Sequence, residues 1–166
     1  QPDELQGWAE QLVSAIVKVH SVPVTTELKS TVESLFAGYD RSFSQSEPSA
    51  RIKKHSLGPR LWQRLKELWP TIDKSAEVLL HGDYWPGNTL WKSDSLVAII
   101  DWEEPRIGNP SRDIAVLLHE ATLFGMDIEK FVLNQYAKVV NKPLHDLEFW
   151  KAIRLMDAMP DPGGWV

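Results

Sequence analysis

Three side chains in the middle of the chain, Asp83, Asn88 and Asp101, have the types and the spacing that could hold a divalent cation. Each lies at one end of a short apolar run, where a strand would deliver it to a loop. Carboxylate and amide oxygens suit Mg²⁺, which fills its other positions with water or with phosphate oxygens. The sequence therefore predicts a magnesium site made of these three side chains and open to a phosphate group.

A β-hairpin is the expected support of this site. Two short strand-like runs, 88–92 and 96–101, are separated by a polar turn sequence. If the turn is centred after Asp94, Asn88 faces Asp101 across the two strands. The Cβ atoms of directly opposed residues are roughly 4.5 to 5.5 Å apart, close enough for both side chains to reach one small cation.

The acidic residues of the chain gather around the same segment. The whole chain has a net charge of −5, and residues 77–120 alone contain eight Asp and Glu against three Lys and Arg. Such a local surplus favours a cation, although a solvated acidic surface would have the same composition. The negative net charge is untypical of proteins that bind nucleic acid, so no nucleic-acid partner is predicted.

Most of the elements that must position this site are predicted to be helices. Pro59 and the pair Asn109-Pro110 are typical of helix starts, and residues 114–118 are apolar on nearly every side, which indicates a central buried helix. The polar stretch 40–57 predicts a loop with room for one helical turn. Helices are expected over residues 3–19, 27–39, 59–68, 110 onward, 127–140 and 145–159, a buried strand over 78–80, and a chain-breaking segment over 160–164.

Length and composition bound the class of protein. A chain of 166 residues with 43% hydrophobic and 25% charged residues is typical of one folded domain, here residues 1–166. No apolar run approaches the ~18 residues of a spanning helix, and the first residues are unlike a secretion signal. Cysteine is absent, which suits a reducing compartment. These features predict a cytoplasmic protein without a membrane partner.

Three ordered motifs resemble the aminoglycoside phosphotransferase family, whose members are relatives of choline kinases and distant relatives of protein kinases. The motifs are HGDYWPGN at 81–88, IIDWE at 99–103 and GNPSRDIA at 108–115. The resemblance implies an α+β fold, namely the mainly helical C-terminal lobe of a protein-kinase-like fold. In it, a small β-hairpin carries the catalytic loop and the metal site.

The resemblance also implies roles for individual residues. Asp83 would orient the substrate hydroxyl and accept its proton, while Asn88 and Asp101 would hold Mg²⁺ on the phosphates of ATP. His81 is expected to be a packed structural residue. Asp113, in the first turn of its helix, is expected to brace the backbone of the catalytic loop.

Five further residues are candidates for contacts with the acceptor. Glu103 and Glu104 could bind cationic groups of an acceptor, although exposed loop acids explain them equally well. The aromatic residues Tyr84, Trp85 and Trp102 could form walls of the cleft, although core packing is the default expectation in a chain with eight Trp.

The sequence has no motif for the part of a kinase-like nucleotide site that the N-terminal lobe supplies. No Gly-x-Gly occurs in the sequence, and the first 76 residues indicate helices and loop instead of a Gly-rich hairpin followed by a strand lysine. We therefore expect the N-terminal, nucleotide-clamping lobe to be absent from this chain, and the chain alone to be inactive.

The motifs thus predict an ATP- and Mg²⁺-dependent phosphotransferase for a hydroxyl group of a small molecule. Aminoglycosides, macrolides, choline and amino-alcohols are all acceptors in the family, and the sequence does not choose among them. A kinase-like lobe that binds without turnover is one alternative. A metal-dependent phosphoesterase is another, since Gly82-Asp83 and Gly87-Asn88 fit it superficially, but its strand-borne Asp-x-His is missing upstream.

Overall fold

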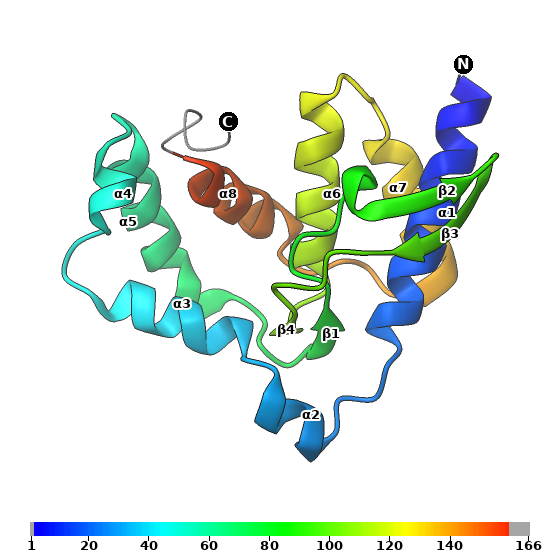
Figure 1. Cartoon of the computed structure of the whole chain (residues 1–166). Coiled ribbons are helices and arrows are strands. Elements are labelled where there is room, and N and C mark those ends of the chain that lie inside the picture. Colours follow the sequence, from blue (N-terminus) through cyan, green and yellow to red (C-terminus); the bar gives the residue numbers. More distant parts are fainter. Residues whose placement is uncertain (1, 160–166) are drawn as a thin grey trace.

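The computed structural model of the chain describes residues 2–159. Helices form most of it, and two small sheets lie between them (Figure 1). The helices are α1 (Pro2–His20), α2 (Thr26–Thr31), α3 (Leu35–Ser44), α4 (Ala50–Lys53), α5 (Gly58–Leu68), α6 (Ser111–Leu123), α7 (Glu129–Val140) and α8 (Leu147–Ala158), with 3₁₀ turns η1 (Trp69–Thr71) and η2 (Pro86–Asn88). The strands are β1 (Val78–Leu80), β2 (Thr89–Lys92), β3 (Ser95–Ile99) and β4 (Arg106–Gly108). The predicted α+β fold class, a mainly helical lobe with a small hairpin, is confirmed.

Helix α6 runs through the centre of the molecule and is buried along most of its length, as the sequence predicts. Asn109 caps it, because its Oδ1 accepts the N–H of Ser111 at 2.9 Å. Two apolar clusters meet at this helix. One joins α6 to α1 and α7, and the other joins Ala115 of α6 to α3, α5 and α8. In Figure 1, α1 and α7 accordingly lie on one side of α6 and α3 to α5 on the other.

Strands β2 and β3 form the predicted antiparallel hairpin, but in a different register. Thr89 pairs with Ile99 and Lys92 with Ser95, with one irregularity in between. The turn is therefore shorter and centred one residue earlier than expected, and Ser93 in it has a φ of 53°. A residue with positive φ reverses the chain within two residues, which is the reason for the shift.

The expected helix over 27–39 is in fact two helices, α2 and α3. The chain is extended at Val32, and the side chain of Ser34 caps α3 by accepting the N–H of Ala37 at 3.4 Å. Between the two helices the backbone pairs with β4, since Ile107 donates its N–H to the carbonyl of Glu33 at 3.0 Å. This tertiary hydrogen bond, and the pairing of β4 with β1, were not predicted.

The remaining elements follow the sequence closely. The polar stretch 40–57 contains the end of α3 and one short helix, α4, and Pro59 lies in the first turn of α5. Helices α7 and α8 each begin two residues later than expected. The predicted breaker at 160–164 lies outside the described residues. None of the helices described is both long enough and apolar enough to cross a membrane.

Candidate active site

One buried carboxylate holds the backbone of the loop between β1 and β2. Asp113, in the first turn of α6, is fully buried. Its Oδ2 accepts the N–H of His81 at 2.9 Å, and its Oδ1 accepts the N–H of Gly82, also at 2.9 Å. Oδ2 lies 3.1 Å from Nε2 of His20, the last residue of α1. The carboxylate therefore connects α1, α6 and the loop immediately before Asp83.

The ionised form of Asp113 is favoured in spite of its burial. Burial by itself raises the pKa of a carboxyl group. The hydrogen bonds from His20 and from the N–H groups of His81 and Gly82 outweigh that effect, so the pKa of Asp113 lies below its ordinary value. A fixed negative charge behind the loop thus aligns two consecutive peptide groups.

The shape of the loop requires a glycine at position 82. Gly82 has a φ of 91°, and a Cβ atom there would lie 2.0 Å from the carbonyl oxygen of Glu104. A side chain would strain the backbone and also collide with the segment that follows Asp101. The loop between β1 and β2 and the segment that follows Asp101 are therefore in direct contact.

Asp83 and Asn88 are brought together at the two ends of the same loop. Nδ2 of Asn88 donates to the carbonyl oxygen of Asp83 at 2.9 Å and to its Oδ2 at 3.1 Å. Asn88 is buried, whereas Asp83 is partly exposed. Both bonds use the amide nitrogen, so within residues 2–159 the amide oxygen of Asn88 accepts no hydrogen bond.

Asp101 lies just beyond β3, and its side chain is exposed. Ile100 donates its N–H to the carbonyl of Asn88 at 2.9 Å, so Ile100 stands opposite Asn88 and the predicted pairing with Asp101 is wrong. The early turn by itself would place Ile99 opposite Asn88, and the irregularity between Leu90 and Trp91 moves the register by one residue to Ile100. Asp101 has a φ of 64°, and left-handed backbone is uncommon for an aspartate and gathers at functional sites.

Asp83 and Asp101 open on the same cleft. It has a volume of about 650 Å³ and lies between the catalytic loop, the residues after β3, and helices α3, α4, α6 and α8. Acids come mainly from the loop side and arginines mainly from the helices. Its charged lining comprises Glu33, Asp83, Asp101, Glu103, Glu104, Asp157, Arg41, Arg51, Arg106, Arg112 and Arg154.

His81 and Tyr84 lie in the interior. His81 is fully buried, and its Nε2 lies 2.9 Å from the carbonyl oxygen of Ile100. Tyr84 is also fully buried and donates its hydroxyl to the carbonyl of Leu12 in α1 at 2.8 Å. Of the two possibilities stated for Tyr84, the structure shows core packing, because its ring joins the apolar cluster of α1, α6 and α7.

Trp85 and Trp102 also lie away from the cleft of Asp83. Trp85 stacks on Phe124, with ring centroids 5.7 Å apart and planes 1° from parallel. Trp102 covers the ring of His81 at a centroid distance of 4.6 Å and lines a separate groove beside α1. Their role as cleft walls, expected from the sequence, has no support in this arrangement, since both cover the loop from outside.

Glu103 and Glu104 lie on the rim of the cleft, and both are exposed. The Glu104 carboxylate lies 4.0 Å from the guanidinium of Arg106. Glu103 has no ion-pair partner in the part of the chain that the structure describes. Contact of either residue with an acceptor remains a prediction.

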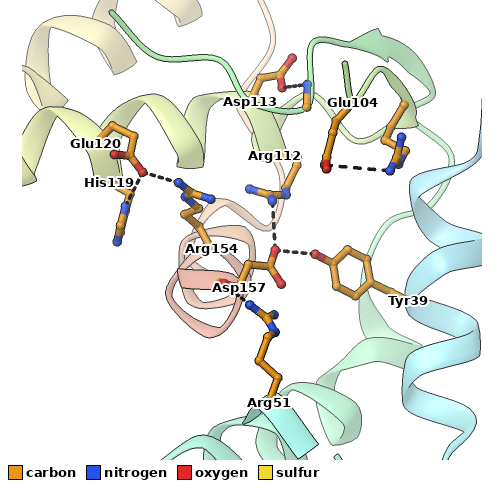
Figure 2. Close-up of polar contacts among 11 residues, drawn as sticks. Tyr39, Arg51, Glu104, Arg112, Asp113, His119, Glu120, Arg154 and Asp157 are labelled. Carbon is orange, nitrogen blue, oxygen red and sulfur yellow. Dashed lines mark hydrogen bonds and ion pairs between the residues drawn. The ribbon is translucent and has the colours of Figure 1, made fainter. Parts of the chain in front are cut away.

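The helical wall of the cleft was not predicted as part of the site. The carboxylate of Asp157 accepts Nη2 of Arg112 at 3.0 Å and the hydroxyl of Tyr39 at 2.9 Å, and its carbonyl accepts Nη1 of Arg51 at 2.6 Å (Figure 2). Burial raises the pKa of Tyr39, which keeps its hydroxyl a donor. The one sequence signal for Arg112 is its place beside Asp113 in the motif at 108–115.

The donors on the loop side fit magnesium. Asp83 and Asp101 contribute carboxylate oxygens on the cleft, and Asn88 has an amide oxygen without a hydrogen bond from the described residues. Among those residues no group of three or more His, Cys, Asp or Glu is placed to hold a metal ion. A hard cation bound by one or two carboxylates and completed by phosphate oxygens is the usual mode for Mg²⁺.

Sequence comparison places the chain in a family. A model of the phosphotransferase enzyme family, APH, matches residues 1–154. The chain belongs to this phosphotransferase family. It is 28% identical over 147 residues to Protein LicA of Haemophilus influenzae, covering 87% of this chain and 52% of LicA. It is also 28% identical over 95 residues to 4-hydroxytryptamine kinase of Psilocybe cyanescens, covering 49% of this chain and 26% of that kinase.

Solved structures of phosphotransferases share the fold. An aminoglycoside-3′-phosphotransferase of type VIII has a TM-score of 0.67 at 19% identity over 94% of this chain and 62% of its own. The macrolide 2′-phosphotransferase MphH of Brachybacterium faecium has a TM-score of 0.62 at 18% identity over 92% and 51%. An aminoglycoside phosphotransferase of Streptomyces rimosus, in complex with ADP and streptomycin, has a TM-score of 0.64 at 16% identity over 93% and 63%. The protein-kinase-like fold is thereby confirmed.

The chain spans only part of these proteins. It covers about half or less of the length of the curated relatives that it matches. It covers between half and two thirds of each of the three solved chains described above.

Proposed function

We propose that the protein containing this chain is an ATP- and Mg²⁺-dependent phosphotransferase that acts on a hydroxyl group of a small molecule. One observation carries the proposal: Asp83 and Asp101 line one cleft, and Asn88 is hydrogen-bonded to Asp83 at its side. Family membership and a relative in complex with ADP support the same reaction.

In this reaction Asp83 receives the proton of the acceptor hydroxyl. The hydroxyl oxygen forms a bond to the γ-phosphorus of ATP, the bond from that phosphorus to the bridging oxygen breaks, and ADP leaves. Asp83 suits this role because Asp113 fixes the preceding peptide groups and Asn88 holds one of its carboxylate oxygens. Phosphoryl transfer depends mainly on such positioning and on neutralisation of charge.

Asn88 and Asp101 would hold Mg²⁺. The bound ion supplies positive charge that neutralises the phosphate oxygens of the nucleotide. Without such an ion the negative charge of the loop side is not neutralised, because neither Asp83 nor Asp101 has an ion-pair partner among the described residues.

The rest of the nucleotide site is proposed to lie outside residues 1–166. The chain covers 52% of LicA and 51% to 63% of the three solved chains described above, so much of the length of these proteins has no counterpart in it. We therefore interpret residues 1–166 as one domain, the C-terminal lobe, which acts together with an N-terminal nucleotide-clamping lobe.

The decisive experiment uses the intact protein that contains this chain. Purified protein is incubated with ATP, Mg²⁺ and a panel of small hydroxyl compounds, and ADP and phosphorylated product are both measured. We expect acceptor-dependent product formation that EDTA abolishes and added Mg²⁺ restores. Binding of ATP without product from any acceptor would favour the alternative of a binding module.

A second measurement tests the division into lobes. The isolated chain of 166 residues should show no turnover under conditions in which the intact protein is active. Robust turnover by the isolated chain would contradict the proposal that half of the nucleotide site lies elsewhere, without contradicting the phosphotransferase activity itself.

A further inference from the structure

The helical wall of the cleft holds more hydrogen-bond donors than acceptors. Arg51 of α4, Arg112 of α6 and Arg154 of α8 all line the cleft. Arg154 is paired with Glu120, and the carboxylate of Glu120 also lies 3.1 Å from His119 (Figure 2). Asp157 then has the one carboxylate among the described residues that Arg112 contacts. Arg51 contacts only the main-chain carbonyl oxygen of Asp157.

Arg112 is not satisfied by this arrangement. Its side chain is 9% exposed, and Nη2 donates a hydrogen bond to the carboxylate of Asp157. Nε and Nη1 of Arg112, and Nε of Arg154, are buried and have no hydrogen-bond partner among the described residues. Buried donors are nearly always paired in native proteins, so unpaired ones just beneath the surface of a cleft call for an explanation.

Arg51 supplies a cation that no carboxylate of the described residues pairs with. It is exposed, comes from the single turn α4, and donates a hydrogen bond to the main-chain oxygen of Asp157. Together, Arg51 and Arg112 face one carboxylate, Asp157, which also accepts the hydroxyl of Tyr39. One negative charge near the two guanidinium groups would restore the balance.

Guanidinium groups recognise one kind of ligand particularly well. Their planar donors match the two oxygens of a carboxylate or of a phosphate, and such bonds are shorter and stronger than neutral ones. The opposite wall has the reverse character, since Asp83, Asp101 and Glu103 are carboxylates without ion-pair partners in the described residues. A ligand that fills the cleft should therefore have its negative group at the helical wall.

We infer that the acceptor of this phosphotransferase carries a carboxylate in addition to its hydroxyl group, and that Arg112 and Arg51 bind that carboxylate. The inference rests on the proposed function, because it assigns the acceptor end of the same cleft. The hydroxyl lies toward Asp83 and the carboxylate toward α4 and α6. A hydroxylated phosphate ester shares the oxyanion chemistry and is the alternative source that the experiment must separate.

The experiment compares matched acceptors with the intact protein. The pairs are glycerate with glycerol, and homoserine with 3-aminopropan-1-ol; glycerol 3-phosphate tests the phosphate ester. We expect kcat/KM to be at least about 10-fold higher for the carboxylate of a pair than for its partner, the size of one charge-assisted hydrogen bond. Preference for the neutral or cationic partner in both pairs, or for glycerol 3-phosphate, would overturn the inference and leave the phosphotransferase activity standing.

Substitutions of arginines test whether the helical wall causes the preference for the carboxylate acceptor. Arg51→Gln should raise the KM for the carboxylate acceptor by about 10-fold and leave the KM for ATP unchanged. Arg112→Lys, which keeps the charge but loses the planar donors, should do the same. Arg60→Gln, an exposed arginine of α5 outside the cleft lining, is the matched control and should change neither constant. Equal effects of Arg51→Gln and Arg60→Gln would contradict the assignment.

A binding measurement keeps the inference testable without turnover. Malate, which has a hydroxyl group and two carboxylates, should raise the Tm of the intact protein, and the rise should be lost in Arg51→Gln but kept in Arg60→Gln. Sodium chloride at the same ionic strength controls for screening. No malate-dependent rise in the unaltered protein counts against the carboxylate site, whereas failure of the phosphotransferase assay alone does not.

Discussion

The two walls of the cleft differ in how their charges are matched. On the loop side the backbone is tightly held, since Asp113 fixes His81 and Gly82, yet the carboxylates of Asp83 and Asp101 have no cationic partner in the described residues. On the helical side the carboxylates of the described wall are paired with arginines, and it is guanidinium nitrogens that lack partners.

We interpret this difference as one between charges that stabilise the fold and charges that are proposed to serve a ligand. Paired and buried groups, such as Arg154 with Glu120, contribute to the fold and stay in place when the cleft is empty. Carboxylates that are held close together without a counter-charge repel one another, by about 4 kcal/mol at ~4 Å for an effective dielectric constant of 20. The cation proposed for the loop side would supply that counter-charge.

The strongest test of this distinction is the removal of Asp101. In the intact protein, Asp101→Ala should lower kcat by about 10⁴-fold, because it removes one of the two side chains proposed to hold Mg²⁺. Asp94→Ala, an exposed acid in the hairpin turn, is the matched control and should leave kcat unchanged. Steady-state ADP release measures both variants. Normal turnover by Asp101→Ala would show that the loop-side carboxylates do not serve a cation.

Replacing Asp83 should have the next largest effect. Asp83→Asn keeps the shape and the contact with Asn88 but cannot accept the proton, so kcat should fall by roughly 10³-fold, within the usual range for a lost general base. The KM for ATP should change little, which a titration of ATP at saturating acceptor measures. A large rise in that KM with an unchanged kcat would instead assign Asp83 to nucleotide binding.

Asp113 tests the bracing of the loop side. An asparagine has one acceptor oxygen, so Asp113→Asn cannot serve both the His81 and the Gly82 N–H groups, and the loss of a buried charge with its partners costs about 3 kcal/mol of unfolding free energy. Chemical denaturation at neutral pH measures this change. Unaltered stability would mean that the loop holds its shape without the carboxylate.

The pH dependence of the same variant sharpens the test. The pKa of Asp113 is lower in the folded protein than its ordinary value of 3.8, so the unfolded chain binds more protons in this range. The stability that the carboxylate contributes is complete above pH 3.8 and is lost as the pH falls toward the lower folded pKa. The difference in unfolding free energy between the parent protein and Asp113→Asn should therefore shrink at acid pH and stay constant near neutrality.

The smallest effect is expected on the helical wall. Tyr39→Phe removes one of the two side-chain donors to the Asp157 carboxylate and leaves the Arg112 ion pair, so we expect a loss of about 1 kcal/mol of unfolding free energy. Thermal unfolding followed by circular dichroism measures it. A loss of several kcal/mol would indicate that this wall is as tightly coupled as the loop side.

Much of the fold could be predicted because local pattern and tertiary packing agree. The apolar residues of α6 and the cap at Asn109 predict a buried helix, and the helix is found there. The break between α2 and α3 could not be predicted, because it depends on a hydrogen bond between Ile107 and Glu33, residues that are distant in sequence. The hairpin register failed for another reason, since a single residue, Ser93, with positive φ shifts the turn.

The candidate site also contains some features that the sequence predicted and others that it did not. Motif spacing predicted the grouping of Asp83 with Asn88, which their hydrogen bond bears out as a contact while their catalytic roles remain predictions. For Tyr84 the sequence favoured core packing over a cleft wall, but nothing in the motif indicates that its hydroxyl finds a partner in α1. The arginines of the helical wall come from four separate helices, so their meeting is a property of the packing and not of any one segment.

If an acceptor is held at both walls, as we propose, the order of residues at the start of α6 would set the length of molecule that can react. Arg112 and Asp113 are consecutive, and because successive side chains of a helix diverge by about 100°, one reaches the helical wall and the other the catalytic loop. Both are anchored in the same buried turn, so the two walls cannot separate without unfolding that turn. Acceptors should accordingly be selected by the number of bonds between their reacting oxygen and their anchoring group, with homologues one or two carbons longer reacting poorly.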